Sequence, residues 1–287
     1  MKKIINFKKN HPVIFSLITV LVLDVCLVAI KGLCRATGIL QSGSNTDYLI
    51  REFFVLCVAI VFVFVTGQQH IYKCGTKIIL KGLWSGFVFF VLAVIGGWLF
   101  IEEAVAAGRE LKPAWEIAAF VIFLIFVGAA EESVSRGIIS DVLIERFGKS
   151  GKGIWLAAVL SGVIFGFSHI TNVLSQSAGE TVVQMIATSM TGTLFSAIYI
   201  RHRNIFVPMI LHSVFDFMTM CSNGLFVGGS VADNVAAENF EFFTSLGQAL
   251  QSQSLFVIIA LFILRPKVLR KIAERNRENA ALTKSSV

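Results

Sequence analysis

Long apolar stretches alternate with short charged segments along almost the whole chain of 287 residues. Most stretches approach the ~20 residues that an α-helix needs to cross a hydrocarbon core of ~30 Å. Because backbone polar groups must be satisfied internally in lipid, the pattern predicts an all-α, polytopic transmembrane helix bundle. The span at 114–147 would measure ~50 Å as a helix, so we expect it to project from the membrane or to bend near Gly128. About eight spans are expected, at residues 13–33, 50–66, 79–101, 114–147, 153–171, 181–200, 204–220 and 247–264.

The composition agrees with a membrane protein and excludes other classes. Hydrophobic residues make up 55% of the chain and charged residues 15%, and the mean hydropathy is +0.77. Soluble globular domains carry about 25% charged residues, so an ordinary soluble enzyme and a disordered chain are both excluded. The five Cys are scattered without the spacing of a zinc site, and we interpret them as packing residues.

The charges predict how the chain is threaded through the membrane. Eight spans place both termini and every second loop on one side, where most of the 25 Lys and Arg residues fall. By the positive-inside rule, this side and both termini are cytoplasmic. The net charge of +7 is therefore a topology signal and indicates no nucleic-acid partner. The basic start resembles a signal peptide, but the long apolar run behind it favours a retained first helix.

Among the ionisable side chains inside the expected spans, six on three spans form the informative set. A charged group at the middle of a bilayer costs at least ~2.5–3.5 kcal/mol, so such residues usually face a cavity and have a function. Asp24, in the first span, stands apart, and we interpret it as a helix contact or a cavity residue. The six are Glu131, Glu132 and Arg136 in span 114–147, His169 in span 153–171, and His212 and Asp216 in span 204–220.

Helical spacing relates these residues to one another. Glu132 and Arg136 are four residues apart and can form an ion pair, whereas Glu131 points ~100° away from that face. In a hairpin of spans 114–147 and 153–171, Glu131 and His169 both lie ~23 Å from the turn and are therefore level. A buried carboxylate suits a general base for water, and an imidazole can shuttle a proton or stabilise an oxyanion. The set therefore favours a hydrolytic site.

Three motifs follow one another in the chain, each on its own apolar helix. They are Glu131-Glu132-x-x-x-Arg136, Phe165-x-x-x-His169 and His212-x-x-x-Asp216. Together they resemble the CPBP family, the CAAX-processing and bacteriocin-processing (Abi) membrane endopeptidases, related to the type II CAAX prenyl endopeptidases. On this basis we divide the chain into N-terminal transmembrane helices (1–112), a catalytic core (113–220), and an outer loop, last span and basic cytoplasmic tail (221–287).

The resemblance implies an intramembrane glutamate protease with a cavity that faces the cytoplasm. Its substrates would be prenylated CAAX-like, signal or bacteriocin-type peptides, and its other partners membrane lipids. Bacterial members of this length favour a bacterial plasma membrane. The predicted catalytic residues are Glu131, Glu132, His169, His212 and Asp216. Glu131 would activate water with the assistance of His169, and His212 together with Asp216 would stabilise the oxyanion. Glu132 and the supporting residue Arg136 would shape the site, with Phe165 as one of its walls.

One residue departs from the family pattern. The CAAX-protease branch carries Asn at the position of Asp216. An Asp in its neutral form still donates a hydrogen bond, but with Glu and His it also belongs to the ordinary ligands of zinc. No His-Glu-x-x-His helix is present, so we expect no metal and no cofactor.

Two other functions fit the same residue types. Intramembrane Glu, His and Asp also form proton relays, so a proton-coupled transporter is an alternative, although the chain shows no internal repeat. A bacteriocin-immunity membrane protein that uses this fold without catalysis is the other alternative.

Overall fold

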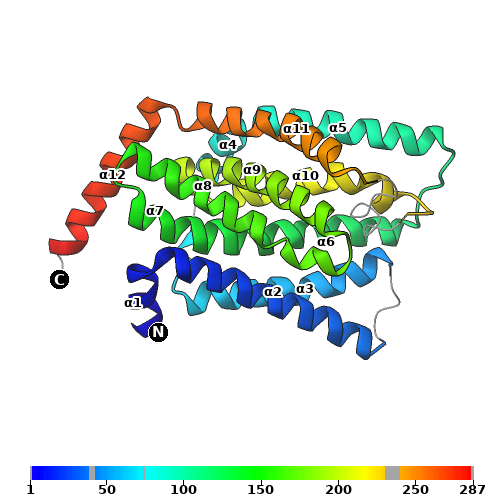
Figure 1. Ribbon diagram of the computed structural model, residues 1–287, viewed down its shortest axis with the longest axis horizontal. Helices are drawn as coiled ribbons and strands as arrows, with labels where there is room; N and C mark the ends of the chain where they lie inside the picture. The colour runs from blue at the N-terminus through cyan, green and yellow to red at the C-terminus, as the bar shows by residue number, and fades with distance from the viewer. Residues whose placement is uncertain (1, 39–42, 74, 230–239, 286–287) are drawn as a thin grey trace.

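The structure is a computed structural model that describes residues 2–38, 43–73, 75–229 and 240–285. Its long helices run side by side along the longest axis, and both termini lie at the same end (Figure 1). Residues 230–239 of the expected outer loop lie outside the described part. The described elements are α1 (Lys2–Asn10), α2 (Pro12–Ala36), α3 (Asn45–Val65), η1 (Gln69–Tyr72), α4 (Thr76–Ser85), α5 (Phe87–Ala106), α6 (Ala114–Glu132), η2 (Ser133–Ser140), α7 (Asp141–Phe147), α8 (Gly151–Phe167), η3 (Ile170–Leu174), α9 (Ala178–His202), α10 (Phe206–Leu225), α11 (Phe242–Ile263) and α12 (Pro266–Ser285).

The helices confirm an all-α, multi-pass membrane bundle. The expected span at 204–220 is also a helix, α10, but its polar side chains, His212 and Asp216 among them, make it less apolar than the others. Within the described part of the chain, seven helices are long and apolar enough to cross a membrane: Pro12–Ala36, Asn45–Val65, Phe87–Ala106, Ala114–Phe147, Gly151–Leu174, Ala178–His202 and Phe242–Ile263.

Two details of the expected spans were wrong. The span at 79–101 is divided, because α4 ends at Ser85 and α5 begins at Phe87. A Cβ on Gly86, between them, would lie 2.4 Å from Leu211 Cδ1, so this junction packs closely on α10. The helix of the span at 114–147 is not interrupted at Gly128, which lies inside α6. Its irregular segment is η2 (Ser133–Ser140), a π-helix between α6 and α7.

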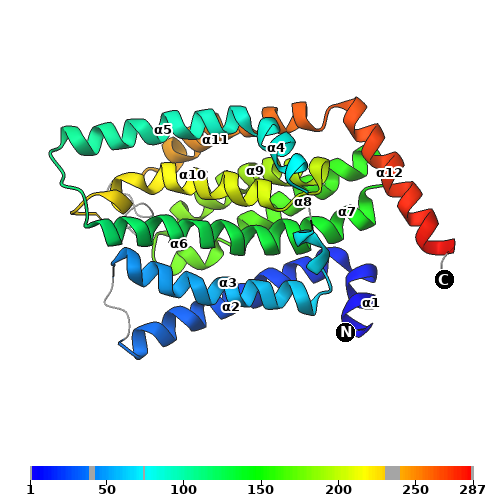
Figure 2. The same cartoon turned by 180° about the vertical axis from the view of Figure 1, so that it is seen from behind.

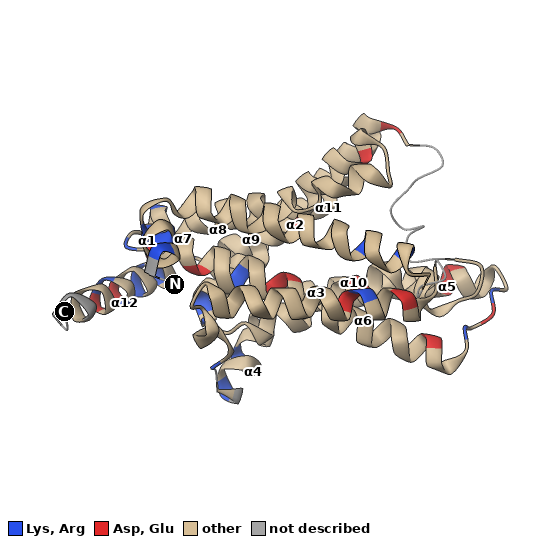
Figure 3. Cartoon of the chain, turned by 90° about the horizontal axis from the view of Figure 1, so that it is seen from below, with Lys and Arg blue, Asp and Glu red and all other residues tan. Residues whose placement is uncertain are grey.

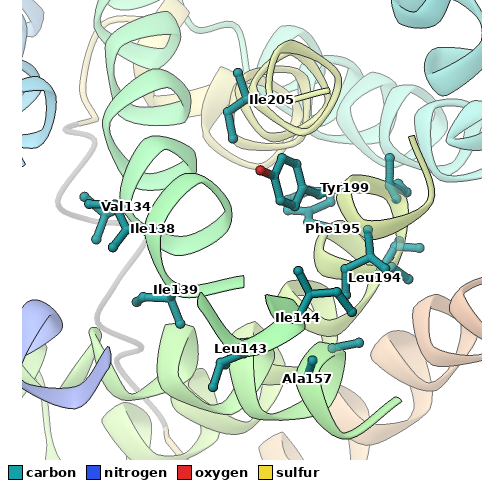
Figure 4. Close-up of a cluster of buried hydrophobic side chains, with 14 of the residues drawn as sticks. Val134, Ile138, Ile139, Leu143, Ile144, Ala157, Leu194, Phe195, Tyr199 and Ile205 are labelled. Atoms are coloured by element: carbon teal, nitrogen blue, oxygen red, sulfur yellow. The ribbon is translucent and has the colours of Figure 1, made fainter. Parts of the chain in front are cut away.

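The core lies where η2, α7, α8 and α9 meet. Figure 4 shows the apolar side chains of these elements gathered in one cluster. Ile138, Leu143 and Leu194 are fully buried there, and every residue of η2 is buried. The pairs α8–α9, α3–α6, α6–α10, α5–α10 and α9–α11 make the main helix contacts (Figure 2). The motif helices α6, α8 and α10 all contribute buried side chains to this core.

Basic residues gather at the end of the bundle that holds α1 and α12, and several acidic residues lie along its middle (Figure 3). At the same end the carboxylate of Asp141 binds His70 Nε2 at 3.1 Å and the guanidinium of Arg203. That this end is cytoplasmic stays a prediction from the positive-inside rule.

Candidate active site

His212, on α10, is the centre of the site. Its Nδ1 lies 2.8 Å from Glu132 Oε1, and the same oxygen accepts a hydrogen bond from Arg136 Nη1 at 2.9 Å. The ionised carboxylate of Glu132 can only accept hydrogen bonds, so His212 Nδ1 is the donor to this oxygen. Glu132 and Arg136 are fully buried, and His212 is 6% exposed. The ion pair that the four-residue spacing predicts is therefore formed, and it fixes the orientation of the imidazole.

The guanidinium of Arg136 is held from three further directions. Nη2 donates to the carbonyl of Gly192 at 3.0 Å. The Phe165 ring lies 4.5 Å from the guanidinium carbon and the Phe195 ring 5.4 Å from it. A Cβ on Gly192 would lie 2.8 Å from Phe165 Cδ1 and 3.2 Å from Arg136 Nη2, so only glycine leaves room for both. Ion pair, carbonyl and two aromatic faces together compensate the buried positive charge.

The other nitrogen of His212 faces two more carboxylates. Nε2 lies 3.4 Å from Asp216 Oδ2 and 3.7 Å from Glu131 Oε2. The side chain of Glu131 is 35% exposed, whereas that of Glu132 is fully buried. The ~100° offset between neighbouring helical residues therefore turns one carboxylate toward open space and the other into the protein.

The open space is a cavity of about 280 Å³ between α6, α8, α9 and α10. It brings together four of the five residues that the sequence predicts as catalytic and the predicted wall residue Phe165. The fifth, Glu132, does not line the cavity, and neither does Arg136. The reactive residues on the cavity are Glu131, His169, His212 and Asp216.

His169 occupies a place that differs from the expected one. The sequence predicts it inside the helix 153–171, but α8 ends at Phe167 and His169 precedes the short η3. Its Nδ1 lies 3.1 Å from the carbonyl oxygen of Phe165. Since a carbonyl can only accept, Nδ1 donates, and the neutral imidazole keeps Nε2 free as a proton acceptor.

A close approach of α6 and α10 brings Glu132 to His212. A Cβ on Gly128 would lie 2.4 Å from Ser213 Oγ and 2.8 Å from the carbonyl oxygen of Met209. A side chain at position 128 would therefore push the two helices apart. Gly128 matters for this contact, and not for a bend of α6.

The cavity also has a polar wall on α9 that the sequence analysis did not identify. Gln184, Thr188 and Thr191 line it, at the spacing of one helix face. The side-chain Oε1 of Gln184 accepts hydrogen bonds from the side-chain amides of Asn172 and Gln176, both at 2.9 Å. Polar residues at intervals of four and three in an apolar span were the available signal.

Two buried acids lie within electrostatic reach of Glu131. Asp24 on α2 is 4% exposed and Glu52 on α3 is 8% exposed. The interpretation of Asp24 as a cavity or contact residue stays open, and Glu52 was missed because it stands near the start of its expected span. In the described part of the chain, no group of three or more His, Cys, Asp or Glu side chains is arranged to hold a metal ion.

The comparison with protein families identifies the segment that carries this site. Residues 113–218 match the family described as type II CAAX prenyl endopeptidase Rce1-like, and they contain all three motifs. Neither the curated proteins nor the solved structures gave a match. The family supports protease activity in general, and the apolar helices make the protein a multi-pass membrane protein. Through residues 113–218, the chain is similar to the Rce1-like type II CAAX prenyl endopeptidases.

Proposed function

We propose that the protein is an intramembrane endopeptidase that hydrolyses peptide bonds with water activated by Glu131. One observation carries the proposal: Glu131, His169, His212 and Asp216 come from three separate helical segments and line a single cavity. All the residues that line the cavity except Thr219 and Met220 fall within the segment that matches the peptidase family. A concave site with a few convergent polar groups is the usual setting of catalysis.

In the first step Glu131 removes a proton from water, and the water oxygen attacks the carbonyl carbon of the peptide bond. The exposure of its side chain to the cavity supports this role, because a general base must reach the water. Glu132 is unsuited to it, since its Oε1 is engaged by Arg136 and His212. The free Nε2 of His169 assists by accepting a hydrogen bond from the same water.

The attack converts the carbonyl into a tetrahedral oxyanion. His212 with both nitrogens protonated donates Nε2–H to this oxygen, while Nδ1–H stays bound to Glu132. A neutral Asp216, 3.4 Å from Nε2, provides a second donor at the same place. The intermediate then collapses, the C–N bond breaks, and the proton held by Glu131 passes to the leaving amine.

Glu132 and Arg136 are positioning residues in this mechanism. Neither lines the cavity, and they act through His212. A buried carboxylate on the far nitrogen fixes the tautomer and the plane of a catalytic imidazole, as in the serine-protease triad.

The family description favours prenylated CAAX-like peptides as substrates, with signal and bacteriocin-type peptides as further candidates. Ligand pockets usually measure about 300–1,000 Å³. A cavity of about 280 Å³ therefore suits a short extended segment around the scissile bond and not a folded protein. The rest of the peptide, and any prenyl chain, would lie outside it.

The test is cleavage by the purified full-length protein of a farnesylated CAAX peptide and of the same peptide without the farnesyl group. General-base catalysis contributes about 10²–10⁴-fold, so Glu131→Gln is expected to lower kcat by at least 10²-fold with little change in KM. Glu103→Gln, an exposed carboxylate on α5, is the matched control and should behave as wild type.

Two results would overturn the mechanism. The first is a Glu131→Gln variant as fast as wild type. The second is activity lost with a chelator and restored by zinc, which would make the carboxylates and imidazoles metal ligands. Cleavage of the farnesylated peptide alone would assign the prenyl group to the substrate.

One observation favours a second candidate, proton-coupled transport. Asp24 and Glu52 extend the carboxylates around Glu131 onto two further helices. Chains of intramembrane acids are typical of proton pathways. Proton flux into liposomes that depends on the protein and is abolished by Glu131→Gln, without peptide cleavage by wild type, would select this function.

A further inference from the structure

A second cavity, of about 490 Å³, lies at the end of the bundle where α9 ends and α12 begins. It is separate from the candidate active site and shares no residue with it. Five of its seven lining residues are basic and the other two are aliphatic. They are Arg201, Arg265, Lys267, Val268, Lys271, Ile272 and Arg275.

The cavity is formed because α12 is fixed against the bundle. After Pro266 the chain turns away from the direction of α11, so α12 leads off the end of the bundle (Figure 1). Ile272 and Ala273 are buried in the main apolar core. Asn276 Nδ2 donates to the carbonyl of Gly148 at 2.9 Å. The basic groups therefore sit on an anchored helix and not on a loose tail.

Spacing places the basic side chains of α12 on one face. Lys267, Lys271 and Arg275 recur at intervals of four and so stack along the helix. Arg201 reaches the same cavity from the last turn of α9, and Arg265 from the junction before α12. Three elements thus converge on one basic concavity.

No described carboxylate neutralises this charge. None of the five basic groups has an Asp or Glu within ion-pair distance among the described residues. Arg201 Nη1 and Arg275 Nη2 instead donate to backbone carbonyls, of Ile263 at 3.2 Å and of Ile200 at 3.5 Å. Burial and the positive charge of Arg203 lower the pKa of the Arg275 guanidinium. Five converging cations without a counter-charge favour an anionic ligand.

We propose that this cavity binds the phosphate headgroup of an anionic phospholipid. Guanidinium and ammonium groups are the usual partners of phosphate oxygens. The cavity lies where the spans α9 and α11 end, which is the depth of headgroups. Val268 and Ile272 give it an apolar side.

The same end of α11 offers a path for acyl chains. Leu261 and Phe262 are 53% and 71% exposed and stand one helical turn before Arg265. A lipid can therefore place its phosphate among the basic groups and its acyl chains along α11. A free phosphate ion would use only the first of these features. The two features together favour a lipid over a free phosphate ion as the ligand.

The test is native mass spectrometry of the full-length protein in detergent, titrated with dioleoyl phosphatidylglycerol, with dioleoyl phosphatidylcholine or with inorganic phosphate. We expect adducts of the phosphatidylglycerol at concentrations where phosphatidylcholine gives none. Each basic residue near an anionic surface contributes about fivefold in affinity, so Lys267→Gln/Lys271→Gln is expected to weaken binding by about 30-fold.

The matched control is Arg270→Gln/Arg277→Gln, which removes the same charge from exposed positions of α12 outside the cavity. It should weaken binding by no more than about twofold. Equal losses in both variants would overturn the proposal, because binding would then follow net charge alone. Binding of inorganic phosphate as tight as that of the lipid would also overturn it, in favour of a soluble ligand. Circular dichroism and size-exclusion chromatography establish that each variant is folded. The lipid-binding measurement does not depend on peptidase activity, so its failure is distinguishable from a failure of the proposed function.

Discussion

Arg136 gives the sharpest test of how the site is built. Replacement by Met keeps an unbranched apolar stem and removes the guanidinium group with its charge. The ion pair to Glu132, the hydrogen bond to the Gly192 carbonyl and the contacts with the Phe165 and Phe195 rings are then all lost. Glu132 stays fully buried with only His212 as a partner.

Removal of one partner from a buried ion pair costs about 3–5 kcal/mol, because the remaining charge is uncompensated. The retained bond from His212 to Glu132 places the expected value near the lower end, about 3 kcal/mol. The double variant Glu132→Gln/Arg136→Met removes both charges, and its stability is expected to return to within about 1–2 kcal/mol of wild type. Its activity should stay low, since the neutral amide that replaces the Glu132 carboxylate no longer supplies the negative charge that holds a protonated His212.

The assay is denaturant unfolding in mixed micelles, together with kcat on the peptide substrate. Arg277→Met, on the exposed surface of α12, serves as the control and should change stability by no more than about 0.5 kcal/mol. A loss below about 1 kcal/mol for Arg136→Met would refute the reasoning, because Glu132 would then need no counter-charge. Full activity in the double variant would refute the positioning role.

Three further predictions concern neighbouring residues. Gly128→Ala is expected to lower kcat by at least tenfold and stability by about 1–3 kcal/mol, because the added Cβ would lie 2.4 Å from Ser213 Oγ. Unchanged kinetics would contradict the close approach of α6 and α10. Asp216→Asn is expected to keep kcat/KM within about tenfold of wild type, because Asn retains a hydrogen-bond donor. Asp216→Ala removes the donor and is expected to lower kcat/KM by ~10²-fold or more. Equal losses in both variants would indicate that the site needs the negative charge. Asp141→Asn removes the partner of Arg203 at the basic end of the bundle and should cost about 2–3 kcal/mol in micelle unfolding, with kcat of the remaining folded protein unchanged.

The fold was predictable because lipid leaves the chain few choices. A backbone in hydrocarbon must satisfy its own hydrogen bonds, so apolar length alone predicts where helices lie. The rule does not predict how a helix is interrupted. At Gly86 a single glycine costs only about 1 kcal/mol in a helix, and the break depends on packing against Leu211. At the end of α8 the residues that follow Phe167, Ser168 and His169, include no proline or glycine to mark the stop.

Helical spacing alone predicted the contacts within one helix and the common depth of Glu131 and His169, whereas the convergence of three motif helices followed from the family resemblance. The spacing of Glu132 and Arg136 predicts their pairing without knowledge of any other helix. The bond from Arg136 to the Gly192 carbonyl depends on how α9 is rotated about its axis, which local spacing does not contain. The polar wall at Gln184 and Thr188 was missed for the same reason, because their spacing indicates that they share one face of α9 but not what that face is turned toward.

The adjacency of Glu131 and Glu132 explains why this site can be assembled on one short stretch of helix. A hydrolase of the proposed kind needs one carboxylate that meets water and one that holds an imidazole in a dry environment. Neighbouring positions on a helix differ by ~100°, so a single turn supplies both environments without a loop or a second helix. Glu132 then faces Arg136 and His212 Nδ1 in the core, and Glu131 faces the cavity 3.7 Å from His212 Nε2. Exchanging which of the two is buried would require α6 to rotate against α10, and the close contact at Gly128 prevents that rotation.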